Sequence, residues 1–247
     1  MLLINTLLDQ IHTGWAAVFL PLVFAALAYG LRGVNLSGAV AGWIVSFILY
    51  AGAGPRIFAV LILVFFLTWA ATKLGYQHKQ RLGTAEKKGG RTGSQVMANV
   101  GLAAICASAY FLSHENPLFL LALIATLTEV TVDTVSSELG QAFSDTARLI
   151  TNWKKVPAGT NGAISLVGTL GGISGAVVIS AACVFLGLLH WIETFLLVFA
   201  AVFGMAFDSY LGATLERRGF LNNNAVNFIG TLSAALIVGA FYMLSHG

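Results

Sequence analysis

Long apolar segments are the feature of this sequence that most restricts how it can fold. Runs such as "FAVLILVFFLTWAA" and "ETFLLVFAAVFGMAF" recur along the chain, and about 20 apolar residues are enough for a helix to cross the hydrocarbon core of a bilayer. Only 9% of the 247 residues are charged, against about 25% in soluble domains. We therefore predict an all-α fold, a polytopic transmembrane helical bundle in which residues 1–247 form a single integral-membrane domain.

The hydropathy pattern predicts eight membrane spans. They are Trp15–Leu31, Leu36–Gly52, Arg56–Lys73, Ser94–Ser113, Pro117–Ser137, Ala163–Leu188, Trp191–Leu215 and Ala225–Ser245. Several are short or rich in glycine, so tilted and kinked helices are expected. The first residues, "MLLINTLLDQIHTG", lack a basic region and a small-residue cleavage site. We therefore expect an interfacial lead-in there and no signal peptide.

Basic residues predict the orientation of the spans, because lysine and arginine concentrate in cytoplasmic loops. The third loop, "TKLGYQHKQRLGTAEKKGGR", is the most basic segment of the chain. If this loop is cytoplasmic and the spans alternate, only Arg56 of the 13 basic residues falls outside. The protein is thus expected in the bacterial inner membrane or an equivalent membrane, with a cytoplasmic active face and both termini outside.

Two segments near the C-terminal end resemble one another. "TNGAISLVGTLGG" from Thr160 aligns with "NNAVNFIGTLSAA" from Asn223, and each follows a span that contains an aspartate, Asp133 or Asp208. We interpret the last four spans as parallel repeats of one helical hairpin. The alternative is that small residues recur in membrane helices for packing alone.

Acidic residues inside apolar spans are the strongest functional signal. Glu129 and Asp133 are four residues apart and share a helix face, and Asp208 lies in another span. Ionisable groups inside spans face the bundle interior or a water-filled cavity and mark functional sites. The alternative role is structural, as ion pairs with Arg91 or a lysine that hold helices together.

The polar turns before two spans suit anion binding. "KKVPAGTNG" places two lysines and a Gly-rich turn before one predicted span, and "LNNNAVN" crowds four asparagines at the start of another. Free N–H groups and the helix dipole favour phosphate at such positions, although helix capping by one Asn or Thr is the simpler role. With the acids, these turns form the residue set used in phosphoryl transfer, because Mg²⁺ takes one or two carboxylates plus phosphate oxygens.

Four motifs together resemble one family of membrane proteins. "DTVSSELG", "VPAGTNGAISLVG", "DSYLGATLE" and "NNNAVN" are similar, in this order, to the integral-membrane family that includes plant phytyl-phosphate kinase and the animal transmembrane protein 19. That family is distantly similar to CTP-using phytol and dolichol kinases and to CDP-diacylglycerol synthases. The resemblance implies phosphoryl transfer from a nucleoside triphosphate to an isoprenyl monophosphate.

The resemblance and the residue chemistry together give one set of predicted site residues. Asp133, Glu138 and Asp208 are the predicted catalytic residues and the predicted ligands of Mg²⁺ or Mn²⁺. The predicted substrate-binding residues are Arg91, Ser137, Lys154, Lys155, Gly159, Thr160, Asn161, Gly162, Ser209, Asn223, Asn224 and Asn227.

The function predicted from this set is a membrane-embedded lipid kinase that converts an isoprenyl or alkyl monophosphate, such as phytyl phosphate, to the diphosphate. Its expected partners are a nucleoside triphosphate (CTP or similar), the lipid monophosphate and membrane lipid, with no nucleic acid. Two alternatives stay open: a transporter or flippase of an anionic lipid or small anion, and a cytidylyltransferase that releases pyrophosphate.

Overall fold

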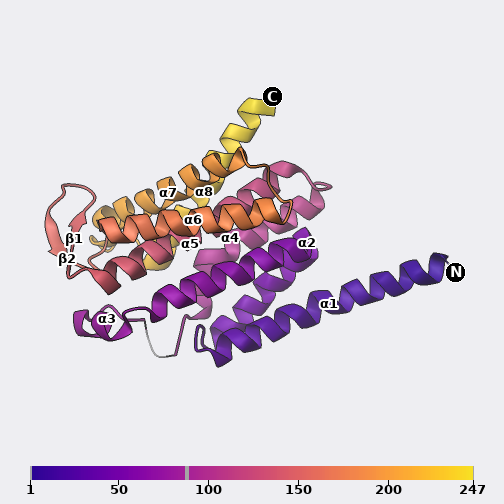
Figure 1. Cartoon of the computed structure of the whole chain (residues 1–247), viewed down its shortest axis with the longest axis horizontal. Helices are drawn as coiled ribbons and strands as arrows, with labels where there is room; N and C mark the ends of the chain where they lie inside the picture. The colour runs from indigo at the N-terminus through magenta and orange to yellow at the C-terminus, as the bar shows by residue number, and fades with distance from the viewer. Residues whose placement is uncertain (1, 87–88, 247) are drawn as a thin grey trace.

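The computed structural model describes residues 2–86 and 89–246 and consists mainly of long helices packed side by side (Figure 1). The helices are α1 (Leu2–Gly30), α2 (Leu36–Lys73), α3 (Tyr76–Leu82), α4 (Gly93–Leu112), α5 (Pro117–Phe143), α6 (Leu166–Phe185), α7 (Glu193–Leu211) and α8 (Asn223–His246). A π-helical turn, η1 (Gly212–Glu216), continues α7. Six of the described helices are long and apolar enough to cross a membrane, as the sequence predicts for a polytopic helical membrane protein.

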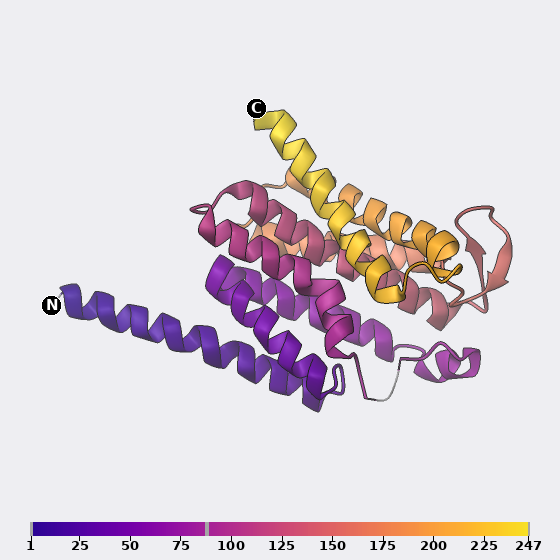
Figure 2. The ribbon, with the colours of Figure 1, turned by 180° about the vertical axis from the view of Figure 1, so that it is seen from behind.

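The helix α2 is a hairpin of two spans. Gly54 has non-helical backbone angles (φ 85°, ψ 175°) and precedes Pro55, which cannot continue the hydrogen-bonding pattern of the preceding turn. The chain reverses there, and the two halves of α2 lie side by side in both views of the ribbon (Figures 1 and 2). These halves correspond to the predicted spans Leu36–Gly52 and Arg56–Lys73. The eight predicted spans therefore correspond to α1, the two halves of α2, and α4 to α8.

The segment between α5 and α6 forms a small sheet that the sequence analysis did not predict. Its strands are β1 (Thr146–Leu149), β2 (Lys155–Pro157) and β3 (Ala163–Ile164), in the order β2-β1-β3 with both pairs antiparallel. Figure 1 shows the β1–β2 hairpin projecting from one end of the bundle. These two- to four-residue strands contain few alternating apolar residues, so their sequence reads as a loop.

The helix α5 lies at the centre of the bundle. In an apolar stretch of 18 residues within α5, 78% of the residues are buried. The corresponding share is 33–50% for the other five long apolar helices. It packs against α2, α4, α6, α7 and α8, and Thr126, Thr128 and Thr131 satisfy their buried hydroxyls by donating to carbonyls one turn earlier. Because α5 is enclosed, its acidic residues are also placed inside the bundle.

The two C-terminal hairpins, α5–α6 and α7–α8, have the arrangement that parallel repeats require. The helices α5 and α7 run in the same direction through the bundle, and α6 and α8 return (Figures 1 and 2). The aligned glycines Gly168 and Gly230 both lie against the preceding helix of their hairpin, although the atom nearest to a Cβ added at Gly230 is the Glu129 Oε1 of α5, at 2.8 Å. A Cβ added at Gly168 would meet the Ser136 carbonyl of α5, and one added at Gly230 would lie 3.3 Å from the Asp208 Cβ of α7. The repeat inferred from the sequence thus has a structural counterpart.

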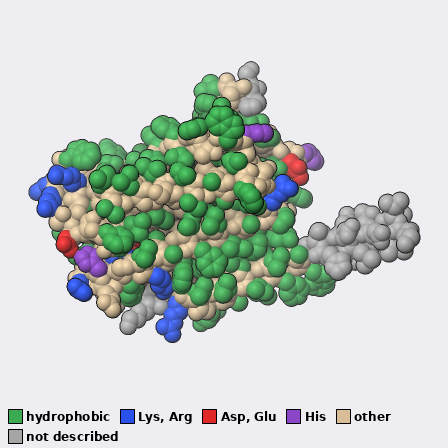
Figure 3. All heavy atoms as spheres, viewed as in Figure 1, with side chains coloured by type: hydrophobic (Ala, Val, Ile, Leu, Met, Phe, Trp, Pro, Cys, Tyr) green, Lys and Arg blue, Asp and Glu red, His purple; other side chains and the backbone are tan. Residues whose placement is uncertain are grey.

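Charged side chains gather at the two ends of the bundle and leave an apolar band between them (Figure 3). The end that carries α3 and the β1–β2 hairpin holds the basic loops, whereas Arg56 lies at the opposite end beside the α2 turn. The predicted segregation of basic residues therefore exists in three dimensions. Lys87 and Lys88, which contribute to the sequence prediction, lie outside the described residues.

Cysteine labelling can assign the sides of the membrane. Arg81 and Glu115 are exposed at opposite ends of the bundle, and the two native cysteines, Cys106 and Cys183, are buried. We expect Arg81→Cys in sealed cells to react with a membrane-impermeant maleimide only after permeabilisation, and Glu115→Cys to react without it. The reverse pattern would overturn the predicted orientation.

Candidate functional site

A polar cavity of about 260 Å³ opens at the basic end of the bundle. Its walls come from α4, α5, α7, the start of α8 and the loop that precedes α6. The sequence segments that carry the four family-like motifs all contribute to it. Residues far apart in the chain are therefore brought to one site.

Two carboxylates enter the cavity from the two helices of the predicted repeat. Asp133 on α5 and Asp208 on α7 both line it, with Thr134, Ser137 and Ser209 beside them on the same helices. Within the described structure, the Oδ2 atom of Asp208 is buried without a hydrogen-bond partner. A buried carboxylate oxygen without a partner is costly, so this atom is suited to a cation or a substrate group.

Glu129 lies one turn deeper than Asp133. Its side chain is 1% exposed, and its Oε1 has no hydrogen-bond partner among the described residues. A Cβ at Gly230 would lie 2.8 Å from this Oε1 and 3.5 Å from the Asp208 Oδ2. The missing side chain at Gly230 therefore lets the two carboxylates converge beneath the cavity floor.

The turn before α6 forms one rim of the cavity. Gly159, Thr160, Asn161 and Gly162 all line it, and both glycines have left-handed φ angles of 82° and 75°. A Cβ at Gly162 would collide with the backbone nitrogen of Ala213 in η1. The turn is thereby seated directly on the π-helical turn that follows Asp208, and such turns are frequent at functional sites.

This contact gives a prediction for Gly162→Ala. We expect the added Cβ to push the turn off η1 and to lower both thermal stability and substrate binding. Gly219→Ala is the matched control, because Gly219 also has a left-handed φ (77°) but has no atoms within 4 Å of an added Cβ. The control shares only the backbone strain, about 1–3 kcal/mol. Equal melting temperatures and equal binding for the two variants would show that the contact is unimportant.

The start of α4 supplies the cationic wall. Arg91 lines the cavity and donates from Nη2 to the Thr134 hydroxyl at 3.4 Å. Its backbone is fixed by two hydrogen bonds to the α1–α2 loop: its N–H donates to the Gly33 carbonyl, and its carbonyl accepts from the Asn35 N–H, both at 3.0 Å. The guanidinium is thus held at the edge of α5, next to the acids.

Three amide side chains complete the wall between α4 and α8. Asn99 donates to the Gln95 carbonyl at 2.7 Å, and Asn227 donates to the Asn99 Oδ1 at 3.4 Å. Gln95 also closes a capping box with Thr92 at the start of α4. The sequence analysis missed Gln95 and Asn99, whose positions near a helix start are equally typical of capping residues.

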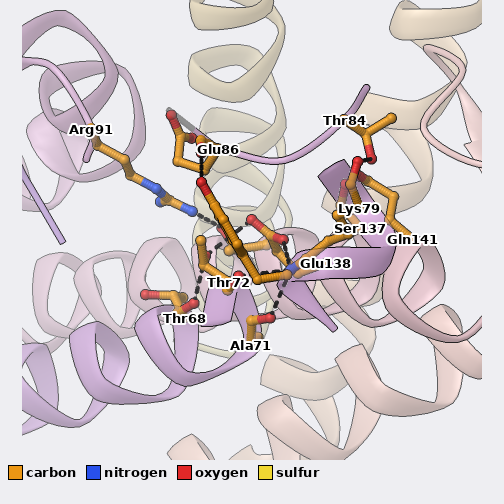
Figure 4. Close-up of polar contacts among 12 residues, drawn as sticks. Thr68, Ala71, Thr72, Lys79, Thr84, Glu86, Arg91, Ser137, Glu138 and Gln141 are labelled. Atoms are coloured by element: carbon orange, nitrogen blue, oxygen red, sulfur yellow. Dashed lines mark hydrogen bonds and ion pairs between the residues drawn. The ribbon is translucent and has the colours of Figure 1, made fainter. Parts of the chain in front are cut away.

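Glu138 is held by an ion pair rather than pointing freely into the cavity (Figure 4). Its Oε2 accepts from the Lys79 Nζ at 2.6 Å and its Oε1 accepts from the Thr72 hydroxyl at 3.0 Å. The Lys79 side chain is fully buried and also donates to the carbonyls of Ala71 and Thr72. Glu138 lines the cavity, but both of its oxygens are engaged in fastening α3 to α2 and α5.

Most of the predicted site residues meet at this cavity. The predicted residues that line it are Arg91, Asp133, Ser137, Glu138, Gly159, Thr160, Asn161, Gly162, Asp208, Ser209, Asn223 and Asn227. Three do not: Lys154 and Lys155 are exposed at the β1–β2 hairpin, and Asn224, at the start of α8, is not among the lining residues. Besides Gln95 and Asn99, the lining includes Glu216 in η1, which the site prediction did not include.

The donor set suits a divalent cation only in part. Among the described residues, no three His, Cys, Asp or Glu side chains form a group able to hold a metal ion. Mg²⁺, however, is usually bound through one or two carboxylates together with substrate phosphates and water. Asp133 and the unpartnered oxygen of Asp208 meet that requirement, and Glu138 does not join them because Lys79 and Thr72 hold it.

Comparison with known proteins identifies the family. The model of the integral membrane protein family DUF92 matches residues 19–235. The chain is 34% identical over 202 residues to an uncharacterized membrane protein of Synechocystis, covering 80% of this chain and 78% of that one. It is 32% identical over 215 residues to the chloroplastic protein VTE6 of Arabidopsis thaliana, covering 84% of this chain and 65% of VTE6.

A third relative is archaeal: an uncharacterized membrane protein of Methanocaldococcus jannaschii is 30% identical over 226 residues, 90% of this chain and 92% of its own. No solved structure matches the fold. The family model covers every residue that lines the polar cavity, and three relatives share most of the chain's length. This chain therefore belongs to the DUF92 family of integral membrane proteins.

Proposed function

We propose that this protein transfers the γ-phosphoryl group of a nucleoside triphosphate to an isoprenyl or alkyl monophosphate, giving the lipid diphosphate. The observation that carries the proposal is the polar cavity. There, Asp133 and Asp208 face a cationic wall at Arg91 and a Gly-rich turn at residues 159–162. The similarity to VTE6, together with the motif resemblance to phytyl-phosphate kinase, supports the same reaction.

In the proposed reaction an oxygen of the acceptor phosphate attacks the γ-phosphorus. The bond from that phosphorus to the β–γ bridging oxygen breaks, and the nucleoside diphosphate leaves with the electron pair. The acceptor is already an anion, so no general base is needed. Positioning and charge neutralisation then supply most of the rate enhancement.

The residues of the cavity have distinct roles in this proposal. Asp133 and Asp208 would hold Mg²⁺ (or Mn²⁺), which would supply charge neutralisation for the phosphates. Arg91 binds the acceptor phosphate and is oriented by Thr134. The turn at residues 159–162 and the asparagines of α8 bind the rest of the nucleotide. Glu138 positions the wall of the cavity through Lys79 and Thr72.

The test uses purified protein in detergent with Mg²⁺, γ-labelled CTP or ATP and a panel of isoprenyl monophosphates. We expect label in a lipid diphosphate and none in reactions without Mg²⁺. Release of pyrophosphate with formation of a CDP-lipid would replace this proposal with the alternative of a cytidylyltransferase. Saturable lipid binding without any transfer would favour transport.

A further inference from the structure

A second cavity, largely apolar, adjoins the polar one. It has a volume of about 120 Å³ and lies between α1, both halves of α2 and α4. Its apolar walls include Phe24, Val45, Leu61, Val64 and Phe65. Most of this cavity lies in the N-terminal half of the bundle, of which only α4 and the loop before it also line the polar cavity.

The two cavities share one boundary. Glu86, Arg91 and Asn99 line both of them, so the apolar cavity ends where the cationic wall of the polar cavity begins. Arg32 and Lys73 also line the apolar cavity at this same end. An anionic head group at the boundary would meet Arg91, with Glu86 as the one acidic side chain among the residues that line the apolar cavity, while an attached chain would enter apolar surroundings.

The apolar cavity runs along the helices into the membrane. Leu61 and Lys73 both line it from the second half of α2, and at 1.5 Å per residue they are about 18 Å apart along the helix axis. This length is more than half of the roughly 30 Å hydrocarbon core. A cavity of this length with a volume of only about 120 Å³ is narrow, which suits one chain better than the two chains of a bilayer phospholipid.

We propose that this cavity binds the tail of the single-chain isoprenyl or alkyl monophosphate, with its phosphate at Arg91 facing the polar cavity. The inference rests on the proposed function for the identity of the acceptor. It adds where the tail lies and which residues select its length. Gly42 marks the path of the tail, because it lines the cavity and has open space at the position of a Cβ.

A pair of phenylalanine substitutions on α2 tests the proposal. Gly42→Phe places a ring in the cavity about one helical turn from Gly38. Gly38 itself lies against the backbone of Arg91, because a Cβ added there would collide with the Arg91 carbonyl. Val40→Phe adds the same ring to the outer face, where Val40 is 51% exposed, and serves as the control. We expect Gly42→Phe to lower kcat/KM for a long-chain isoprenyl monophosphate at least about tenfold, the effect of one misfitting group in an apolar pocket. Dimethylallyl phosphate, whose tail is short, should lose less of its kcat/KM than the long-chain substrate.

Photocrosslinking of the wild-type protein gives a readout that does not depend on transfer or on any variant. A long-chain monophosphate with a diazirine in its tail is expected to label peptides of α1, α2 and α4 that contain the cavity residues. Phytyl alcohol with the same diazirine, which lacks the phosphate, should label them far less. Labelling confined to outward-facing residues such as Val40 and Ile44, or to α6 and α7, would overturn the proposal.

The outcomes separate the two proposals. If the wild type transfers no phosphoryl group but the tail labels the cavity, the proposed function fails and the lipid site stands. If transfer occurs but Gly42→Phe and Val40→Phe behave alike for every chain length, the tail lies elsewhere and only this inference fails. A bilayer phospholipid as the resident occupant would give this second result.

Discussion

Replacing Asp208 with asparagine is expected to lower phosphoryl transfer by at least about 10²–10³-fold, the usual loss when a group that stabilises transition-state charge is removed. The substitution keeps the size of the side chain, which matters because α8 packs closely here: a Cβ added at Gly230 would lie 3.3 Å from the Asp208 Cβ. It removes the charge of the carboxylate whose Oδ2 has no partner among the described residues. Turnover is measured with the labelled nucleotide, and folding by the melting temperature and by gel filtration in detergent.

Asp145→Asn is the matched control for this experiment. Asp145 lies at the same end of the bundle, but its side chain is 83% exposed and it does not line the cavity. The control should keep wild-type turnover. The assignment of the acids fails if Asp208→Asn, or the equivalent Asp133→Asn, turns over as fast as Asp145→Asn.

Lys79→Met is expected to reduce the free energy of unfolding by about 3–5 kcal/mol, the cost of breaking a buried ion pair from one side. The substitution leaves the Glu138 Oε2 and the carbonyls of Ala71 and Thr72 without the ammonium that binds all three. Chemical unfolding in detergent micelles measures the loss. A double variant, Lys79→Met with Glu138→Gln, should recover part of it because no buried charge is then left unpaired.

Arg81→Met controls for loss of charge from α3. Arg81 lies two residues away on the same short helix but is exposed, and exposed substitutions usually change stability by less than about 0.5 kcal/mol. If Lys79→Met and Arg81→Met destabilise the protein equally, the buried ion pair contributes nothing specific to stability.

The sequence predicted the spans well because a membrane span depends on the average hydropathy of about 20 residues, not on any single residue. The predicted boundary between the spans Leu36–Gly52 and Arg56–Lys73 is a good example, because the structure turns within it, at Gly54. Ends of helices were less predictable. The helix α5 continues to Phe143, beyond the predicted Ser137, because polar residues on one face can line a cavity while the opposite face stays packed.

The candidate site could be predicted where a residue type is costly in a membrane. Asp133 and Asp208 stood out because a carboxylate inside a membrane span is energetically costly and therefore indicates a functional site. Lys79 did not, since it lies in a loop rich in basic residues and looked like a topology signal. Its burial results from the fold of α3 beneath the end of α5 and cannot be read from local sequence.

The lysines of the β1–β2 hairpin illustrate the opposite limit. Lys154 and Lys155 precede the Gly-rich turn in sequence, and nearness along the chain predicted nearness to phosphate. The antiparallel pairing of β1 with β2 carries both lysines out to the exposed hairpin. Pairing of such short strands depends on tertiary surroundings more than on propensity.

The meeting of an apolar and a polar cavity at Arg91 has a kinetic consequence. One reactant of the proposed enzyme arrives by diffusion in three dimensions through water, and the other by diffusion in two dimensions within the membrane. The rate then depends on the mole fraction of acceptor in the lipid phase, not on its amount per volume of solution. Adding inert phospholipid at a constant total amount of acceptor would slow the reaction, as expected for an enzyme that encounters its acceptor at a surface.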